Sequence, residues 1–227
     1  MKYILVLVAL LPISAIAQQI SYSQFQQDAK TKINLRPEYG NVKKDQDQIA
    51  DDQKFINEET KQSGDRRKAS AEMVKLGFDY LYRGDLETAM KRFNQAWLLD
   101  PKNEDAYWGY GAVYFTFGDT EEALNQFKKG LSINPSSSNI LTDEATIYMS
   151  LYQNKHDLAY MDKAIALFIE SYKIDPKNQN TLFKLSAAYF YKQDCTNAVK
   201  YYKECMLLGG KSISPGYADA LKKQCGL

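Results

Sequence analysis

The sequence predicts an all-α fold in which helix-turn-helix hairpins stack side by side as an α-solenoid. Two observations predict it: residues that recur at a spacing of 34, and apolar residues that follow helical periodicity within each unit. A repeated unit of this kind buries its apolar face only against its neighbours, so several units are needed for a stable core. The recurring pairs are Gly77 and Gly111, Tyr80 and Tyr114, Gly84 and Gly118, Asp85 and Asp119, Ala89 and Ala123, Phe93 and Phe127, and Pro101 and Pro135.

Each unit is expected to contain two helices joined by a short turn. In the first unit, Met73, Gly77 and Tyr80 share one face of a helix. Gly84 and Asp85 are then expected to end this helix and to cap the next one. We expect small residues on both helices to let the two backbones approach closely, and aromatic residues to fill the space where they diverge.

Proline residues mark where the units end. Pro101, Pro135 and Pro176 cannot continue a preceding helix, so they close the first three units. The third interval is 41 residues long, and the surplus over 34 is assigned to Leu151–Asp157, the expected turn of the third hairpin, where insertion costs little. The expected organisation is a signal segment at 1–17, an N-terminal extension at 18–69, repeats at 70–103, 104–137, 138–178 and 179–212, and a capping helix within 213–227.

This pattern resembles the tetratricopeptide-repeat family over residues 70–212. The first unit carries every expected signature type except that Met73 replaces the usual Trp, and the second unit has Tyr110 where Leu is usual. In the fourth unit Ser186 replaces Gly and Cys205 replaces Ala. The resemblance implies a right-handed superhelix whose concave groove is lined by the first helix of each unit.

The resemblance also implies which residues line that groove, and a protein or peptide as the partner. Many of them are aromatic and could supply contact area for an extended peptide or an amphipathic helix. The alternative is that these residues pack between hairpins or are covered by the N-terminal extension. The implied groove residues are Val74, Phe78, Leu81, Tyr82, Asp105, Trp108, Ala112, Phe115, Asn139, Thr142, Thr146, Met149, Asn180, Phe183, Ala187, Phe190 and Tyr191.

One specialised branch of the family holds the C-terminal carboxylates of chaperones through Lys, Asn and Arg side chains in the groove. Val74, Phe78 and Trp108 stand among the positions that would supply these groups. The donors for bidentate carboxylate recognition are therefore missing. We exclude this ligand and expect a groove that is aromatic instead of basic.

The N-terminal extension is expected to be partly helical, with helices over 21–33 and 43–62. The second helix carries a thin apolar stripe at Ile49, Phe55 and Ile56 among intermixed charges. This pattern is typical of a solvated helix that leads into the repeats. The alternative interpretation is a flexible arm that folds on a partner.

The chain contains three cysteines, Cys195, Cys205 and Cys225. Cys205 occupies a small inward position, so we expect a buried free thiol there. Pro215–Cys225 is expected to form a helix that caps the last hairpin and runs antiparallel to the helix that begins near Cys195. The facing ends predict a Cys195–Cys225 disulfide, with three free thiols as the alternative. The spacings match no zinc pattern, and we expect no metal and no cofactor.

The first 17 residues have the features of a cleavable signal peptide. Lys2 precedes the apolar run Ile4–Leu11, and Ala15 and Ala17 fit the cleavage rule, with the cut after Ala17. A membrane anchor is the alternative, but the run is shorter than the about 20 residues that a spanning helix needs. We expect export to the bacterial periplasm or beyond, with eukaryotic secretion as the alternative, and no membrane span after cleavage.

Charge and motif content bear on the remaining classes of function. Removing residues 1–17 takes away one of the 29 basic residues and none of the 28 acidic ones, so the remainder is neutral and nucleic acid is not an expected partner. Catalysis is not expected, because His156 is the only histidine and no phosphate-binding loop is present. We expect a non-enzymatic adaptor or scaffold. The alternatives are a subunit or assembly factor of a bacterial envelope complex that uses the convex face, and a glycan-binding protein or glycosidase with an acid pair in a pocket.

Overall fold

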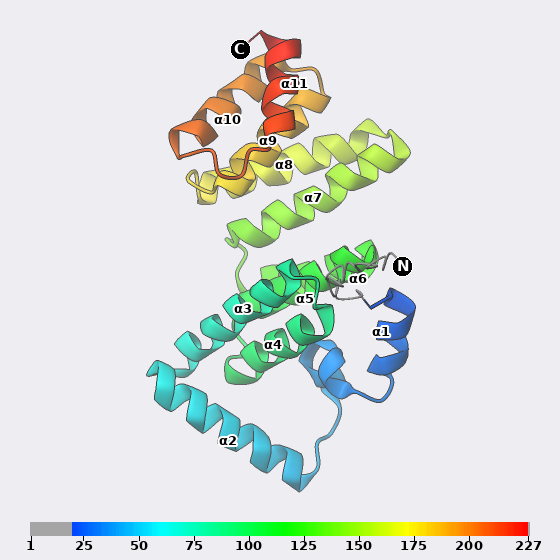
Figure 1. Cartoon of the computed structure of the whole chain (residues 1–227), viewed down its shortest axis with the longest axis vertical. Coiled ribbons are helices and arrows are strands. Elements are labelled where there is room, and N and C mark those ends of the chain that lie inside the picture. The colour runs from blue at the N-terminus through cyan, green and yellow to red at the C-terminus, as the bar shows by residue number, and fades with distance from the viewer. Residues whose placement is uncertain (1–19, 227) are drawn as a thin grey trace, which may run out of the picture.

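The computed structural model describes residues 20–226, and within them all regular secondary structure is helical. Figure 1 shows an elongated stack of helix pairs that runs from the N-terminal helices at one end to the C-terminal helices at the other. The prediction of an all-α solenoid of helical hairpins is therefore confirmed. The predicted signal segment at 1–17 lies outside the described residues.

Four antiparallel hairpins form the stack. The first helices of consecutive hairpins contact one another, whereas the second helices lie farther apart. The stack therefore has an inner face formed by the first helices and an outer face formed by the second helices. The hairpins are α3 (Arg66–Tyr82) with α4 (Leu86–Leu99), α5 (Glu104–Phe117) with α6 (Thr120–Ile133), α7 (Ser138–Lys155) with α8 (Leu158–Ile174), and α9 (Gln179–Tyr191) with α10 (Cys195–Leu207).

Glycine and aspartate form the turn inside each of the first two hairpins. Gly84 and Gly118 adopt left-handed backbone angles, with φ of 80° and 84°, which glycine adopts without steric cost. The following Asp85 and Asp119 cap the second helices, because their carboxylates accept hydrogen bonds from backbone N–H groups at the helix start. The residues at the 34-residue spacing therefore end one helix and begin the next, as the sequence predicts.

The glycines inside the helices make room for phenyl rings. A Cβ atom on Gly77 or Gly109 would overlap the ring of Phe93, and one on Gly111 would overlap the ring of Phe127. Phe93 and Phe127 are completely buried. The aromatic residues that were expected to fill space between the helices therefore lie directly against the glycines.

The additional residues of the third hairpin lengthen its helices. α7 and α8 contain 18 and 17 residues, compared with 14 in each of α5 and α6. His156, with φ of 56°, ends α7, and the Asp157 side chain caps α8. The expectation that Leu151–Asp157 forms a longer turn is wrong, because α7 continues to Lys155. The tip of this hairpin consequently extends beyond its neighbours (Figure 1).

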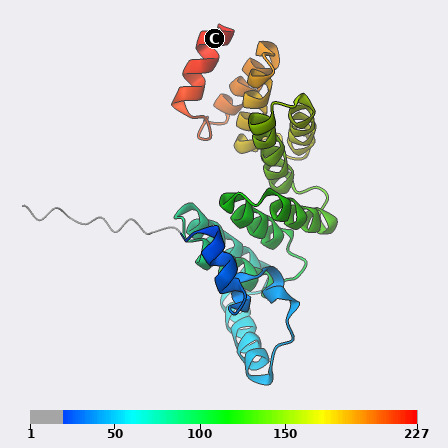
Figure 2. The ribbon, with the colours of Figure 1, turned by 90° about the vertical axis from the view of Figure 1, so that its right-hand side faces the viewer.

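Helices outside the repeats cover both ends of the stack. α2 (Gln46–Ser63) packs against α3, and α11 (Pro215–Cys225) packs against α10. α3 begins at Arg66, ahead of the expected boundary at Ser70, because the Asp65 side chain caps it there. The rest of the N-terminal extension, α1 (Tyr22–Ala29), η1 (Ile33–Leu35) and η2 (Pro37–Asn41), lies beside the first two hairpins in both views (Figure 1, Figure 2).

Candidate protein-binding face

The inner face carries the residues that were implied to line the groove, but several of them are inaccessible. Val74 and Phe78 are only 7% and 9% exposed. Thr142 is completely buried, and its hydroxyl lies 2.8 Å from the Ser171 hydroxyl and 2.6 Å from the Thr181 hydroxyl. The expectation that these three residues offer surface to a partner is therefore wrong, because they pack between helices.

A row of side chains crosses the inner face from α3 to α9. The Trp108 ring centroid lies 4.1 Å from that of Phe78, and Nε1 of Trp108 donates a 2.7 Å hydrogen bond to Oδ2 of Asp143. The other carboxylate oxygen of Asp143 accepts a 3.0 Å bond from Nζ of Lys184. Trp108 therefore holds the hairpins together in addition to facing the groove.

Asp143 and Lys184 belong to this face, although neither was among the residues implied to line the groove. Each follows an assigned residue by four positions, Asn139 in α7 and Asn180 in α9. Residues four apart lie on the same face of a helix, so this spacing could have identified both. They form an ion pair, and the row consequently presents no unpaired charge to a ligand.

Ala187 is also buried, at 8% exposed, and the other implied groove residues have exposed surface. Tyr82 is 77% exposed at the end of α3, and Tyr191 is 45% exposed at the end of α9. Burial raises the pKa of the Asp105 carboxyl at the start of α5, and the neighbouring charge of Glu104 raises it further. The half-buried members are Leu81, Asp105, Ala112, Phe115, Asn139, Thr146, Met149, Phe183 and Phe190, and Asn180 is exposed.

The inner face is hollowed between α7, α9 and α11. The cavity measures 420 Å³, and most of its lining is apolar. Tyr217 of α11 closes one side, with its ring centroid 5.4 Å from that of Phe183 and 5.7 Å from that of Phe190. Tyr217 was not among the residues implied to line the groove, yet it lines this pocket. The lining residues are Met149, Phe183, Lys184, Ala187, Phe190, Tyr191, Ser214, Tyr217 and Ala220.

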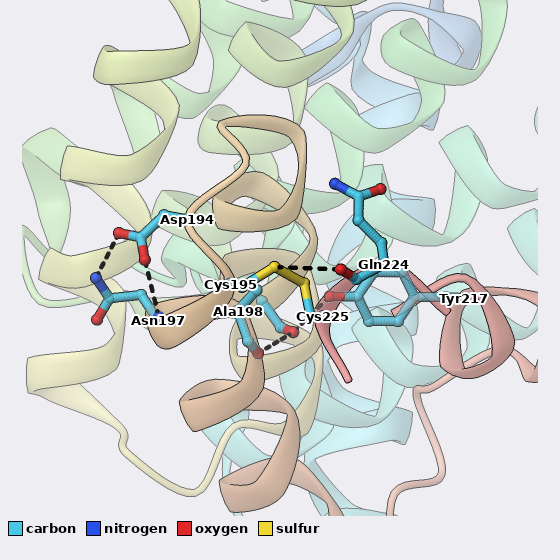
Figure 3. Close-up of a disulfide and its surroundings, with 8 residues drawn as sticks. Asp194, Cys195, Asn197, Ala198, Tyr217, Gln224 and Cys225 are labelled. Carbon is cyan, nitrogen blue, oxygen red and sulfur yellow. Dashed lines mark hydrogen bonds between the residues drawn. A yellow bond between two sulfur atoms is a disulfide. The ribbon is translucent and has the colours of Figure 1, made fainter. Parts of the chain in front are cut away.

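A disulfide bond fixes the far end of the helix that carries Tyr217. Cys195, the first residue of α10, is bonded to Cys225, the last residue of α11, and their Cα atoms lie 5.3 Å apart (Figure 3). Cys205 is free and completely buried, and this burial raises the pKa of its thiol. The structure therefore brings together the two cysteines whose helix ends were expected to meet.

The N-terminal extension lies away from the inner face. The rings of Tyr22 and Phe25 pack on Phe117 at the end of α5, and η1 and η2 contact α4. The segment from α1 to η2 therefore covers the end of α5 and part of α4, and α2 covers the end of the stack at α3. The alternative in which the extension covers the groove is not what the structure shows for residues 20–63.

Two structural features associated with other functions were not found in residues 20–226. No group of three or more His, Cys, Asp and Glu side chains is placed to hold a metal ion. No helix in this part of the chain combines the length and apolar character required to cross a bilayer.

Comparisons with known proteins agree with the architecture. The family model described as "Tetratricopeptide repeat" matches residues 80–142, and no curated protein sequence matches the chain. The TPR protein TTC0263 of Thermus thermophilus superimposes with a TM-score of 0.57 at 17% identity, covering 68% of this chain and 80% of that one. Pseudomonas aeruginosa pilF gives 0.55 at 20% identity, with 70% and 67% covered. A tetratricopeptide repeat protein from Parabacteroides merdae ATCC 43184 gives 0.50 at 22% identity, with 69% and 60% covered.

These identities are low enough that the structural likeness concerns the fold alone. The fold nevertheless agrees with the match over residues 80–142, which spans the α3–α4 turn to the beginning of α7. The 34-residue repeat, the four stacked hairpins and this match agree with one another: residues 80–142 match the tetratricopeptide-repeat model, and the chain has the fold of tetratricopeptide-repeat proteins.

Proposed function

We propose that the protein is a non-enzymatic adaptor that binds a segment of a partner protein on its inner face. The observation that carries this proposal is the 420 Å³ cavity between α7, α9 and α11. Its lining is mostly apolar, and such surfaces on soluble proteins mark sites of interaction. The tetratricopeptide-repeat architecture supports a protein as the partner.

The accessible aromatic residues define where contact is made. Phe190 and Tyr191 lie at the pocket, and Tyr82 lies at the other end of the inner face. Aromatic side chains supply a large contact area and are enriched among the residues that dominate binding energy. The proposed ligand is an extended peptide or an amphipathic helix that places a large apolar side chain in the pocket.

We further propose that the protein acts after export from the cytoplasm. The features of residues 1–17 support this, and so does the Cys195–Cys225 bond, because disulfides persist mainly in oxidising compartments. Fractionation of the native cell, followed by N-terminal sequencing, tests the proposal. A mature chain that begins at Gln18 outside the cytoplasm is expected, and an uncleaved cytoplasmic chain would contradict it.

The binding proposal is tested by affinity capture from the native source with quantitative mass spectrometry. The double substitution Phe190→Ala and Tyr191→Ala removes apolar area from the pocket, and Tyr160→Ala on α8 is the matched control. We expect the double variant to lose the partner at least about tenfold while the control retains it. Undiminished capture by the double variant would rule out the pocket. Trp108 is less suitable, because its bond to Asp143 links α5 to α7.

A second candidate is a structural subunit of an envelope complex that uses the tip of the third hairpin. Leu158 is 56% exposed there, and the nearby rings of Tyr148 and Tyr160 stack with centroids 6.4 Å apart. Nζ of Lys163 lies 4.0 Å from the centroid of the Tyr148 ring, in a cation–π contact. Loss of capture in Leu158→Asp and Tyr160→Ala, with retention in the pocket variant, would favour this second function.

A further inference from the structure

α11 is attached to the stack along a single stripe of its surface. Tyr217, Leu221 and Cys225 follow one another at intervals of four residues, so they lie on one face of the helix. Leu221 is the only residue of α11 that is buried, and Lys222 and Lys223 are exposed. A helix of 11 residues is marginal in water by itself. The position of α11 therefore depends on these few contacts.

The Tyr217 end of the stripe lies in the candidate pocket. The Ser186 hydroxyl donates a 2.7 Å hydrogen bond to the carbonyl of Ala198, so the hydroxyl of Tyr217 donates to Oγ of Ser186, at 2.6 Å. These bonds hold the Tyr217 hydroxyl at Ser186, and its ring lies next to those of Phe183 and Phe190. The ring would leave the pocket wall if α11 moved away.

The Cys225 end of the stripe is the covalent anchor. Residues 208–214 connect α10 to α11 without regular helix, and Gly209 and Gly210 in this connection have positive φ. The disulfide is therefore what fixes the C-terminal end of α11 against the start of α10 (Figure 3).

We propose that α11 is a wall of the peptide pocket and that the Cys195–Cys225 bond controls whether this wall is in place. In the oxidised protein, Ser214, Tyr217 and Ala220 complete the pocket. A dithiol reductant supplies two electrons and two protons, the S–S bond breaks, two protein thiols form, and the reductant becomes a disulfide. α11 then keeps the contacts of Leu221 and Tyr217 but has lost its covalent anchor, and the pocket opens on that side.

The chemistry of the lining identifies the occupant that this wall would select. Lys184 is the only charged lining residue, and its ammonium group is paired with Asp143. The wall supplies the Tyr217 ring and the Ala220 methyl group to an otherwise aliphatic and aromatic surface. The occupant is accordingly a large uncharged apolar side chain of a peptide. This inference rests on the proposed function, and it predicts tight binding by the oxidised protein only.

A measurement without ligand tests the movement of α11. Met149 lines the pocket, so its methyl resonance in protein labelled with [methyl-13C]methionine senses the ring currents of the surrounding aromatic residues. The resonance is assigned with Met149→Leu, and the methyl groups of Met73 and Met90 in the first hairpin are internal controls. We expect reduction with dithiothreitol to shift the Met149 signal and to leave the controls unchanged. An unchanged Met149 signal would overturn the inference.

The double substitution Cys195→Ser and Cys225→Ser provides an independent version of the same test. It should reproduce the shift without reductant, and Cys205→Ala, which leaves the disulfide intact, should not produce it. Because reduction is reversible in the wild-type protein, reoxidation should restore the original spectrum. The spectra of the reduced and reoxidised wild-type protein therefore test the movement of α11 even when the double variant folds poorly.

A binding measurement separates this inference from the proposed function. Peptides are selected from a random phage-displayed library on the oxidised protein, and the dissociation constants of those sensitive to Phe190→Ala are measured by calorimetry. We expect binding to weaken at least about tenfold on reduction and in Tyr217→Ala, but not in Leu207→Ala, a change at an exposed residue at the end of α10. Equal binding by the oxidised and reduced proteins would overturn the role of α11 and leave the pocket function standing. Failure to select any such peptide would count against the pocket function, and the Met149 signal would still decide the behaviour of α11.

Discussion

The hydroxyl of Tyr110 donates a 2.7 Å hydrogen bond to Oδ1 of Asn94, and both residues are completely buried. Nδ2 of Asn94 donates in turn to the carbonyls of Asn34 and Arg36, at 2.9 and 2.8 Å. The backbone N–H of Tyr39 also donates to Oδ1 of Asn94, at 3.3 Å. The Asn94 side chain of α4, which is bonded to Tyr110 of α5, thus anchors the N-terminal extension by binding backbone groups of the extension.

Substitution of Asn94 by Ala should release the extension from the stack. The change removes both donors to the carbonyls of Asn34 and Arg36, and a buried polar group left without a partner costs about 1–3 kcal/mol. Hydrogen exchange of residues 22–41 should accelerate while that of α9 and α10 stays unchanged. Asn125→Ala on the exposed side of α6 is the control. Equal protection of residues 22–41 in the two variants would contradict the anchoring role.

The repeat pattern could reveal the hairpins but not this anchor. Tyr110 stands out in the sequence because Leu is usual at that position of the repeat, yet the partner that explains it lies outside the repeats. The extension has no periodicity of its own, and part of it adopts left-handed angles, with φ of 56° at Glu38, 54° at Tyr39 and 52° at Asn41. Such angles are unfavourable for residues other than glycine. They are present because of tertiary contacts, which a local pattern does not encode.

The candidate site, like the fold, could be predicted from the sequence only where it lies within the repeats. The resemblance placed Met149, Phe183, Phe190 and Tyr191 on one face, and the structure groups them around one cavity. The contribution of Tyr217 was missed, because it depends on how a helix outside the repeats is oriented. The one sequence signal was Ser186 in place of glycine, and the structure shows this hydroxyl bonded to Tyr217. The unusual Ser186 therefore indicated that a contact forms at this position, but the sequence did not identify Tyr217 as the residue in contact.

Substitution of Gly109 by Ala should destabilise the stack. Its Cβ atom would overlap the ring of Phe93, which is completely buried, and overpacking of a core typically costs about 1–3 kcal/mol. Gly216→Ala in α11 is the matched control, because it has φ below zero and no atom within 4 Å of a new Cβ. That control should gain roughly 0.5–1 kcal/mol from helix propensity. Urea unfolding measures both changes, and a neutral Gly109→Ala would show that the ring has room to move.

High pH should weaken the attachment of α1. Burial raises the pKa of Tyr22 to about 12, and the hydrogen bond that its hydroxyl donates to the Asp119 carboxylate adds to the shift. An unfolded tyrosine ionises near pH 10, so folding favours the neutral form. The stabilisation from Tyr22 is therefore fully present below about pH 10 and is lost as the pH rises through about 12.

The titration of Tyr22 is measured as the difference in phenolate absorbance between the wild-type protein and Tyr22→Phe. We expect a difference midpoint well above that of a free tyrosine. Protection of α1 from hydrogen exchange should fall with pH in the wild-type protein and less steeply in Tyr22→Phe. A Tyr22 midpoint near pH 10 would show that neither burial nor the Asp119 carboxylate affects the phenol.

Replacing Thr142 by Val should weaken the junction between the third and fourth hairpins. Its buried hydroxyl contacts those of Ser171 and Thr181, and the three residues lie on α7, α8 and α9. Valine keeps the shape but removes the hydroxyl, which leaves buried groups unpaired at a cost of about 1–3 kcal/mol. Thr146→Val is the control, because the hydroxyl of Thr146 bonds only to a carbonyl in its own helix. Urea unfolding should show a clear loss for Thr142→Val and little change for Thr146→Val. Equal stability of the two variants would mean that the hydroxyl cluster contributes nothing to the junction.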